Sequence, residues 1–391
     1  MRVLHIGKLF APSHGGIEAF MLDVCRHSHT LGVAQGVLVH ADPAITPAAA
    51  DNAPDLSFLS YLDRVPVLGS LGYAPISPQF GHRLSRALRQ FKPTVLHLHL
   101  PNPSVFWVLM NRHARRLPWV IHWHADAWSP DYETTVRYLY PLYRPFEQAL
   151  LKAAARVVVT SPPYLQASPA LQAWRDKCVV VPLALDTQRL TASAEPWHTD
   201  LWQDGQRLRV LAVGRLTAYK GFEVLIKAAS LTAAAAIDVV IAGDGREQAK
   251  LQGLVEALGV ADRVQLVGNV TDSTRNQLLA SCDLVCLPSL NRAEAFGVSV
   301  LEGMAFAKPA VVSKIEGSGL PWLVEHQVSG WHVPPNDAQA LAQCLSELSV
   351  QREQVRAAGQ RAAERHRDHF QSLTVVKQLI EVQQHAQSTR P

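Results

Sequence analysis

The sequence of 391 residues is poor in cysteine and has no long apolar run. Its five cysteines are odd in number and scattered, which argues against the disulfide framework of a small secreted protein. No apolar stretch reaches the ~18 residues that a transmembrane helix needs. Residues 2–7 have the pattern of a buried strand and not that of a signal peptide. We therefore expect a cytoplasmic protein with reduced thiols.

The chain also carries little excess charge. Lysine and arginine number 37 and aspartate and glutamate 33, which gives a formal net charge of +4. This excess is too small to predict nucleic acid binding, although it suits an anionic ligand or an anionic membrane surface. Hydrophobic residues make up 48% of the chain, a proportion that is normal for globular proteins and argues against disorder.

Short apolar runs alternate with amphipathic segments along the chain, and the pattern restarts after a polar stretch. Such alternation predicts βαβ units and mainly parallel sheets, here in two doubly wound α/β domains. We expect domains at 1–185 and 207–365, a linker at 186–206, and a helix at 366–391 that crosses back onto the first domain. Further helices are expected near 104–115 and at 221–236. Two open sheets predict a cleft, with ligands beyond the carboxyl ends of the strands.

Paired glycines, Gly15 and Gly16, open the first predicted helix. Glycine lets a ligand approach the backbone closely, and the free N–H groups of a helix N-terminus favour anions. An ordinary tight turn has the same composition, so this pair alone does not define a site.

Two cations flank the end of the first strand of the second domain. Arg215 ends this strand and Lys220 begins the next helix. A guanidinium, an ammonium and a helix N-terminus can converge on one diphosphate. A solvated basic loop is the alternative, but the position at the carboxyl end of a strand favours a diphosphate site.

Two carboxylates lie near the start of a later helix. Glu294 precedes the helix, Gly297 opens it, and Glu302 lies about a turn inside it. Carboxylates accept hydrogen bonds from sugar and ribose hydroxyls, and the N–H groups of Gly297 and Val298 would point into the same space. Because its helical neighbours are apolar, Glu302 needs a partner, which argues against a simple surface position.

His122 and His124 lie at the carboxyl end of an apolar strand and point to the same face. Together with His97 and His99 they have the composition of a metal site, but no acidic ligand pattern accompanies them. Buried core histidines are a second alternative. We favour a third interpretation, in which His124 faces the cleft near the leaving group or the acceptor.

Together these residues resemble the retaining glycosyltransferases of family four, which have the GT-B fold of two Rossmann-like domains facing a central cleft. The resemblance covers most of the chain and is strongest between residues 209 and 335. Its signature is a glutamate pair at the spacing of Glu294 and Glu302. The paired glycines, the Arg215–Lys220 pair and His124 match in the same order along the chain.

The resemblance implies a role for each residue. Arg215 and Lys220 would neutralise the donor diphosphate as the sugar departs. Glu302 would hold the ribose, and Glu294 the sugar hydroxyls. The implied catalytic residues are His124, Arg215, Lys220 and Glu294. The implied donor-binding residues are Gly15, Gly16, Arg215, Lys220, Gly268, Asn269, Val270, Glu294, Phe296, Gly297, Val298 and Glu302.

No metal or cofactor is implied, because the two cations would do a metal's work and no Asp-x-Asp pair ends a predicted strand. Retention of configuration is implied by the family only. Asp126 is the nearest candidate for a covalent nucleophile, and we do not favour it.

A narrower resemblance joins residues 124–126, 160–164 and 317–322 to bacterial mannosyl- and rhamnosyltransferases of surface polysaccharide assembly. It implies GDP-mannose as donor and a glycan or polyprenyl-diphosphate-linked acceptor. A UDP-sugar- or GDP-rhamnose-dependent transferase is the alternative within the family. The chain departs from the family at 182–186, where Pro-Leu-Ala-Leu-Asp replaces Pro-Asn-Gly-(Val/Ile)-Asp. The turn into the linker is therefore expected to differ.

Segments 80–92 and 137–156 are basic, aromatic and amphipathic, as are helices that lie on membrane surfaces. Ordinary domain helices with solvated basic faces share this pattern. The family context makes both segments candidates for peripheral contact with the inner face of the plasma membrane.

Other functions remain open on the same architecture. A nucleotide-sugar epimerase would convert its donor without any acceptor, and a phosphorylase would need a pyridoxal-binding lysine, which no sequence context suggests. A non-catalytic nucleotide-sugar-binding protein is a further alternative. A binding protein that had lost catalysis would not be expected to keep its site residues, so this alternative is disfavoured by the presence of Arg215, Lys220, Glu294 and Glu302.

Overall fold

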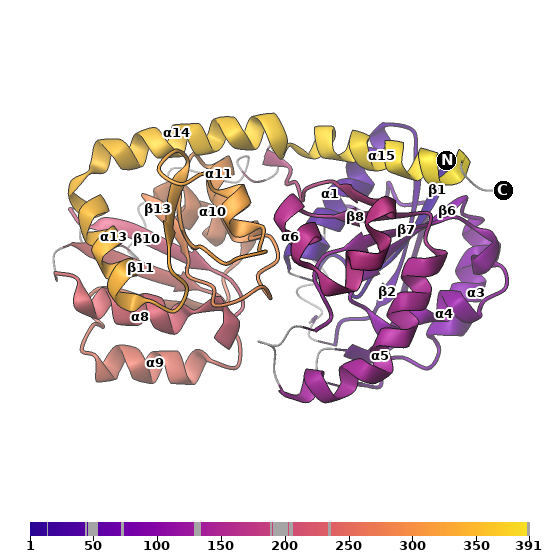
Figure 1. Cartoon of the computed structure of the whole chain (residues 1–391), viewed down its shortest axis with the longest axis horizontal. Helices are drawn as coiled ribbons and strands as arrows, with labels where there is room; N and C mark the ends of the chain where they lie inside the picture. Colours follow the sequence, from indigo (N-terminus) through magenta and orange to yellow (C-terminus); the bar gives the residue numbers. More distant parts are fainter. Residues whose placement is uncertain are drawn as a thin grey trace. The chain divides into compact units, whose positions relative to one another are not determined.

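The chain folds into two compact units, as a computed structural model shows (Figure 1). The first unit combines Met1–Ala184 with Ser372–Pro391, and the second is Leu185–Gln371. The structure describes residues 1–13, 15–43, 45, 54–71, 74–128, 134–187, 190, 202, 206–233 and 236–388, with the backbone alone at 134–137. Most of the predicted linker at 186–206 therefore lies outside the described residues.

A parallel sheet of seven strands forms the centre of the first unit, in the order β3-β2-β1-β6-β7-β8-β9. The strands are β1 (Arg2–Ile6), β2 (Ala34–His40), β3 (Tyr61–Val65), β6 (Val95–Leu100), β7 (Trp119–Trp123), β8 (Arg156–Val159) and β9 (Cys178–Val180). A separate antiparallel pair joins β4 (Gly69–Leu71) to β5 (Ala74–Ile76). The central strands are buried along their length, because both faces of a parallel sheet are covered.

Helices cover this sheet on both faces. They are α1 (Gly16–Thr30), α3 (Phe80–Phe91), α4 (Trp107–Met110), α5 (Thr134–Ala153), α6 (Pro162–Ala167) and α15 (Ser372–Ser388), with 3-10 turns η1 (Pro103–Phe106), η2 (Ala114–Arg116) and η3 (Pro169–Lys177). The last helix, α15, packs on α1 and on strands β6 and β7 (Figure 1). The end of the chain therefore completes one face of the first sheet.

Two predicted helix boundaries are wrong. The expected continuous helix near 104–115 is broken, because Asn111 is extended and its side-chain oxygen accepts from the N–H groups of His113 and Ala114. The terminal helix was expected from residue 366. Instead α14 continues to His369, and the break before α15 falls at residues 370–371.

The second unit contains a six-stranded parallel sheet in the order β12-β11-β10-β13-β14-β15. The strands are β10 (Leu208–Val213), β11 (Ile237–Ala242), β12 (Val264–Gly268), β13 (Leu284–Leu287), β14 (Ala310–Ser313) and β15 (Gly330–Val333). The helices are α8 (Phe222–Leu231), α9 (Gln248–Ala257), α10 (Asp272–Ser281), α11 (Val298–Ala305), α12 (Leu320–Leu323), α13 (Ala338–Val350) and α14 (Arg352–His369), with the 3-10 turn η4 (Ala218–Lys220).

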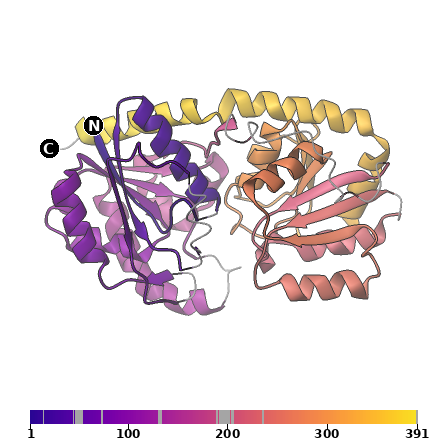
Figure 2. The ribbon, with the colours of Figure 1, turned by 180° about the vertical axis from the view of Figure 1, so that it is seen from behind.

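Alternate residues of these strands build two cores, one on each face of the second sheet. Leu208 and Val210 pack with α8, α9 and α13, whereas Leu211 packs with α10 on the other face (Figures 1 and 2). The helix predicted at 221–236 is shorter than expected, because Thr232 is extended and its hydroxyl donates to the Ala229 carbonyl. Among the helices that the structure describes, none has the length and apolarity to cross a membrane.

Candidate active site

Glycine loops form the carboxyl edge of the second sheet. The Gly214 N–H donates to the Ala242 carbonyl at 3.0 Å, and the Gly243 N–H donates to the Gly268 carbonyl at 2.8 Å. Gly243 has a φ of 145°, and a Cβ there would lie 2.0 Å from the carbonyl oxygen of Gly214. Only glycine allows the backbones of these two loops to approach so closely. At this edge a ligand can therefore contact backbone groups that no side chain covers.

Three of the predicted donor-binding residues lie where β12 ends at this edge. Gly268 has a φ of +68°, in the left-handed region that favours glycine. Asn269 is exposed, and Val270 is half-buried against the core beside α10. Of these three, Asn269 offers its polar side chain at the surface, and Val270 contributes its side chain to packing.

Lys220 is fixed by a buried ion pair. Its Nζ lies 2.6 Å from Oε2 of Glu294, with 12% of the lysine and 9% of the glutamate side chain exposed. Burial opposes the charge on Lys220, but the nearby Glu294 carboxylate and Tyr219 outweigh burial, so the pKa of Lys220 is raised. Lys220 is thus a positioned cation. Arg215, just beyond β10, is exposed.

The loop that carries Glu294 is braced from two sides. The Ser289 hydroxyl donates to the same Oε2 at 3.1 Å, and the Ser318 hydroxyl donates to the Glu294 carbonyl at 2.5 Å. The Gly319 N–H donates to the Ala295 carbonyl at 2.9 Å. Segment 317–322, which the narrower resemblance singled out, therefore holds this loop in place.

Gly297 is the N-cap of α11, at the predicted start of this helix, and has a φ of +97°. The N–H groups of Val300 and Leu301 both donate to the Gly297 carbonyl, so those of Val298 and Ser299 precede the helical ladder. Such groups at a helix N-terminus suit anions and hydroxyl oxygens. Glu294, four residues before Val298, thus lies next to a set of backbone donors.

Glu302 has the partner that its apolar surroundings require. Its Oε1 lies 3.5 Å from Nε of Arg275 in α10, and 10% of the Glu302 side chain is exposed. Arg275 was not among the predicted site residues. It also pairs with Asp272, three residues before it in α10, at 3.0 Å. The glutamate is therefore oriented by a helix that is remote in sequence.

The ring of Phe296 lies in the core. It is 2% exposed and packs near Trp322 at 6.3 Å and Phe370 at 6.2 Å between ring centroids. A side chain this deeply packed is a core residue. Only the Phe296 backbone is suited to touch a ligand.

The predicted residues of the first unit lie at β1 and β7. Gly15 is the N-cap of α1 and Gly16 its first residue, and His14 between them and β1 is outside the described residues. His124 directly follows β7, is 5% exposed, and its ring centroid lies 4.3 Å from that of His122. Burial lowers the pKa of His124 to about 3, so its ring is neutral at pH 7.

Asp126 has a structural role in the turn after β7. Its Oδ1 accepts from Trp123 Nε1 at 3.0 Å and from the Ser168 hydroxyl at 2.5 Å. Its N–H donates to the Tyr164 hydroxyl at 2.7 Å. Because this carboxylate already accepts hydrogen bonds from two side chains, Asp126 is poorly suited to act as a nucleophile.

Glu147 is a buried carboxyl group that was not among the predicted site residues. Tyr140, two helical turns earlier in α5, donates to its Oε2 at 2.9 Å, and Oε1 is buried without a partner among the described residues. Burial, with the charge of Asp126, raises the pKa of Glu147 to about 7, although the Tyr140 hydrogen bond opposes the shift. The signal was the seven-residue spacing of Tyr140 and Glu147, which places them on one helix face.

Glu147→Gln is expected to stabilise the protein above pH 7. The native pKa lies above the value of about 4.5 that an unperturbed glutamate has, so the native state binds more protons, and stability falls as pH rises from about 4.5 through 7. Glutamine lacks this penalty and should add on the order of 2 kcal/mol at pH 8, with little change at pH 4.5. Urea unfolding at both pH values measures the effect. Exposed Glu364→Gln is the control, and equal gains at both pH values would refute the burial argument.

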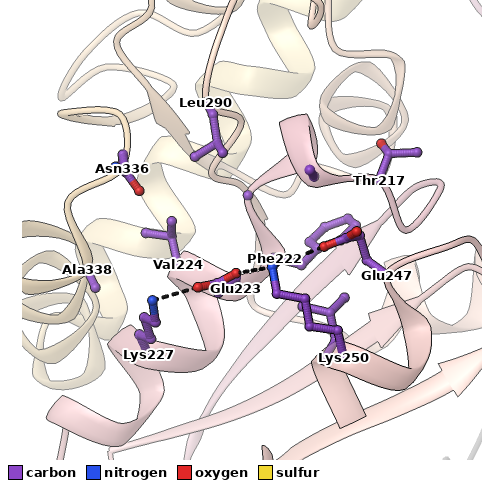
Figure 3. Close-up of a pocket in the computed structure, with 13 residues that line it drawn as sticks. Thr217, Phe222, Glu223, Val224, Lys227, Glu247, Lys250, Leu290, Asn336 and Ala338 are labelled. Atoms are coloured by element: carbon purple, nitrogen blue, oxygen red, sulfur yellow. Dashed lines mark hydrogen bonds and ion pairs between the residues drawn. The ribbon is translucent and has the colours of Figure 1, made fainter. Parts of the chain in front are cut away.

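A hollow of about 270 Å³ lies beside the start of α8 (Figure 3). Its charged lining is internally paired: Glu223 lies 2.6 Å from both Lys227 and Lys250, and Glu247 lies 3.2 Å from Lys250. Neither cation of the predicted diphosphate site lines this hollow. We therefore place the candidate site at the glycine edge and not here.

Comparison with known proteins decides the family. Residues 15–184 match the glycosyl transferase 4-like domain, and residues 195–365 match glycosyl transferases group 1. D-rhamnosyltransferase WbpZ of Pseudomonas aeruginosa is 32% identical over 385 residues, which cover 95% of this chain and 92% of the relative. The chain belongs to this glycosyltransferase family. It is therefore an enzyme of the hexosyltransferase type, as the sequence predicted.

Further relatives agree with this assignment. O-antigen chain mannosyltransferase C of Escherichia coli is 28% identical over 377 residues, 95% of this transferase and 94% of the relative. WaaG, a glycosyltransferase involved in lipopolysaccharide biosynthesis, has a TM-score of 0.70 at 15% identity and covers 97% of this chain and 99% of its own. Anabaena HepE in complex with UDP and glucose has a TM-score of 0.73 at 21% identity, over 97% and 98%. These structures confirm the expected GT-B fold class.

Proposed function

We propose that this transferase moves mannose from GDP-mannose, with retention of configuration, to a glycan or polyprenyl-diphosphate-linked acceptor in surface polysaccharide assembly. The main support for a donor site is the buried Lys220–Glu294 ion pair beside the glycine loops at the carboxyl edge of the second sheet. The names of the relatives, an O-antigen mannosyltransferase and a D-rhamnosyltransferase, support the hexose and the type of product.

In this proposal the positive charge at the donor diphosphate comes from the protein. Lys220 is already oriented by Glu294, so it stabilises the charge of the leaving nucleotide without reorganisation. Arg215 is exposed and adds the planar fork that suits phosphate oxygens. Glu294 uses Oε2 for the Lys220 and Ser289 bonds and offers Oε1 to a sugar hydroxyl. We propose that no metal is needed.

A thermal shift assay with GDP, UDP, ADP and dTDP tests the donor. GDP at 100 times its dissociation constant is expected to stabilise the protein by about 2.7 kcal/mol. Arg215→Ala should abolish the shift, because its guanidinium holds the phosphates. EDTA is present throughout, and a requirement for Mg²⁺ would refute the metal-free proposal. A shift with UDP alone would replace the donor, and no shift with any nucleotide would refute nucleotide binding.

Transfer itself separates the alternatives. Incubation with GDP-mannose and a lipid-linked acceptor should yield a mannosylated product with retained anomeric configuration. Conversion of the donor sugar without an acceptor would indicate an epimerase. Tight donor binding without turnover on any acceptor would indicate a non-catalytic binding protein.

We also propose peripheral contact of the first unit with an anionic membrane, through α4 and α5. On α5 the side chains of Tyr138, Leu142 and Phe146 are 76%, 73% and 50% exposed. Met110 at the end of α4 is 76% exposed. The ring of Phe106, the last residue of η1 directly before α4, stacks on the Phe146 ring at 5.2 Å, so η1 and α5 adjoin. Exposed basic residues accompany them: Arg112, Arg115, Arg116, Arg144 and Lys152.

The other predicted membrane segment, 80–92, uses its apolar face differently. Leu84, Leu88 and Phe91 of α3 are buried in the first unit. Arg83 lies 3.4 Å from Asp63, which reduces its availability to lipid. This segment therefore offers a basic face without exposed apolar anchors.

Tyr138→Glu with Leu142→Glu is expected to abolish flotation with anionic vesicles. Two acidic groups would replace apolar anchors and repel the lipid surface. Both side chains are exposed, so circular dichroism and the melting temperature should change little. Val350→Glu, at a position 81% exposed in the second unit, is the matched control. Equal flotation of the double variant and wild type would refute this surface.

A further inference from the structure

Five histidines line one face of the first sheet. They are His5 on β1, His97 and His99 on β6, His122 on β7 and His124 just after it, and none is more than 5% exposed. In the register of the sheet, His5 lies opposite His97 on the neighbouring strand, and His99 lies opposite His122. Helices α1 and α15 cover this part of the unit (Figure 1).

Three of these rings form a continuous chain. His5 Nδ1 lies 3.1 Å from His99 Nε2, and His99 Nδ1 lies 2.9 Å from His124 Nε2. Both distances are those of N–H···N hydrogen bonds. Burial lowers the pKa of all three rings, to about 4 for His5, to about 3 for His124 and well below the usual value for His99. Each ring is therefore neutral, with one N–H and one bare nitrogen.

Gln35 fixes the direction of the chain. Its Nε2 donates to the Val33 carbonyl at 3.0 Å, which leaves Oε1 facing His5 Nε2 at 2.9 Å. A carbonyl oxygen only accepts, so His5 carries its proton on Nε2 and accepts at Nδ1. His99 must then donate from Nε2 and accept at Nδ1. His124 in turn donates from Nε2, and its Nδ1 is bare.

We propose that Gln35, His5 and His99 are positioning residues that hold His124 in the Nε2–H tautomer. The bare Nδ1 of His124 then accepts a hydrogen bond from a sugar hydroxyl of the substrate. This atom is buried without a partner in the described structure, and it belongs to a residue at the carboxyl end of a parallel strand, where ligands bind. The identity of the hydroxyl rests on the proposed function, whereas the tautomer does not.

The remaining histidines make a second, separate branch. Gln383 Nε2 on α15 lies 2.8 Å from His97 Nδ1, and His97 Nε2 lies 3.3 Å from His122 Nδ1. His97, His99 and His122 also have ligand atoms within 4.8 Å of one another, as a metal site requires. A metal would take nitrogens that the hydrogen-bonded chains use, so the two arrangements exclude each other.

Two-bond ¹H–¹⁵N spectra of the histidine-labelled full chain test the tautomer directly, because they distinguish Nε2–H from Nδ1–H rings. At pH 7 we expect His5, His99 and His124 as neutral Nε2–H rings. Gln35→Met removes the fixed acceptor and should mix the tautomers of His124. It should also lower kcat/KM about 10-fold, the scale of one hydrogen bond.

Two further variants separate positioning from folding. Gln35→Glu keeps the acceptor oxygen for His5. Burial favours the protonated acid, whose hydroxyl can donate to the Val33 carbonyl, so this variant should retain the tautomer and kcat/KM. Gln383→Met removes a similarly buried amide from the second branch. It should leave the His124 tautomer unchanged and kcat/KM within about 2-fold of wild type. An Nδ1–H ring at His124 in the wild type, an unchanged His124 in Gln35→Met, or stoichiometric bound metal would overturn the proposal.

The spectra need neither donor nor acceptor, so they stand apart from the proposed function. An Nε2–H ring at His124 together with no sugar transfer would refute the function and leave the tautomer chain intact. Mixed tautomers in Gln35→Met with unchanged kcat/KM would refute the role of the chain at the substrate.

Discussion

Lys220→Met is expected to lower kcat/KM by about 100-fold or more, the usual effect of removing one preorganised group that stabilises transition-state charge. Lys220 is suited to this role because its ammonium is held 2.6 Å from Glu294 Oε2 in a nearly buried pair. The same change should destabilise the second unit by about 3 kcal/mol, because it leaves the Glu294 carboxylate buried without its counter-charge. Steady-state transfer kinetics and urea unfolding measure the two effects.

A second variant separates the two consequences for Lys220. Lys220→Met with Glu294→Gln removes both charges and should recover most of the stability without recovering activity. Lys227→Met on α8 is the matched control, since 48% of its side chain is exposed and it pairs only at the surface with Glu223. Activity within about 3-fold of wild type in Lys220→Met would contradict a diphosphate role.

Gly221→Ala is expected to destabilise the second unit by about 4 kcal/mol. Gly221 has a φ of +70°, and a Cβ there would lie 2.0 Å from the Pro288 carbonyl oxygen. The left-handed backbone costs about 1–2 kcal/mol for a residue with a side chain, and the clash with a fixed backbone atom costs a further 1–3 kcal/mol or so. Differential scanning calorimetry should show a melting temperature lower by roughly 10 °C.

A glycine in a permissive setting provides the control for Gly221. Gly253 lies exposed inside α9, and nothing lies within 4 Å of a Cβ built there. Gly253→Ala should therefore stabilise the helix by about 0.5–1 kcal/mol. Similar melting temperatures for the two variants would show that the close approach to Pro288 is relaxed in solution.

Several boundaries depended on interactions that propensity does not capture. The strands β3 and β15 lie at sheet edges and lack the continuous apolar runs of central strands, so periodicity did not reveal them. Helix α4 ends at Met110, because the side chain of the next residue, Asn111, accepts hydrogen bonds from the backbone N–H groups that follow. In such places alternative backbone hydrogen bonds compete locally, and tertiary packing decides which of them form.

Some features of the candidate site could be predicted from the sequence, whereas others depended on tertiary packing. Residues tied to loop positions, such as Lys220 and Glu294, could be placed from the sequence because strand ends and glycine turns are local features. The burial of the Phe296 ring could not be predicted, because its sequence position does not show which way the ring points. Glu147 was missed because its burial depends on the packing of α5 against the first unit.

The sequence by itself determined the two parallel α/β units, the family and the loops proposed to carry the site, because alternation, glycine turns and motif order are properties of short segments. Only the tertiary structure joined Lys220 to Glu294 across 74 positions and His5 to His99 across 94. It also placed the Gln35 amide where it sets the tautomers of three rings. Such contacts depend on sheet register and side-chain packing between distant segments, and no local pattern encodes them.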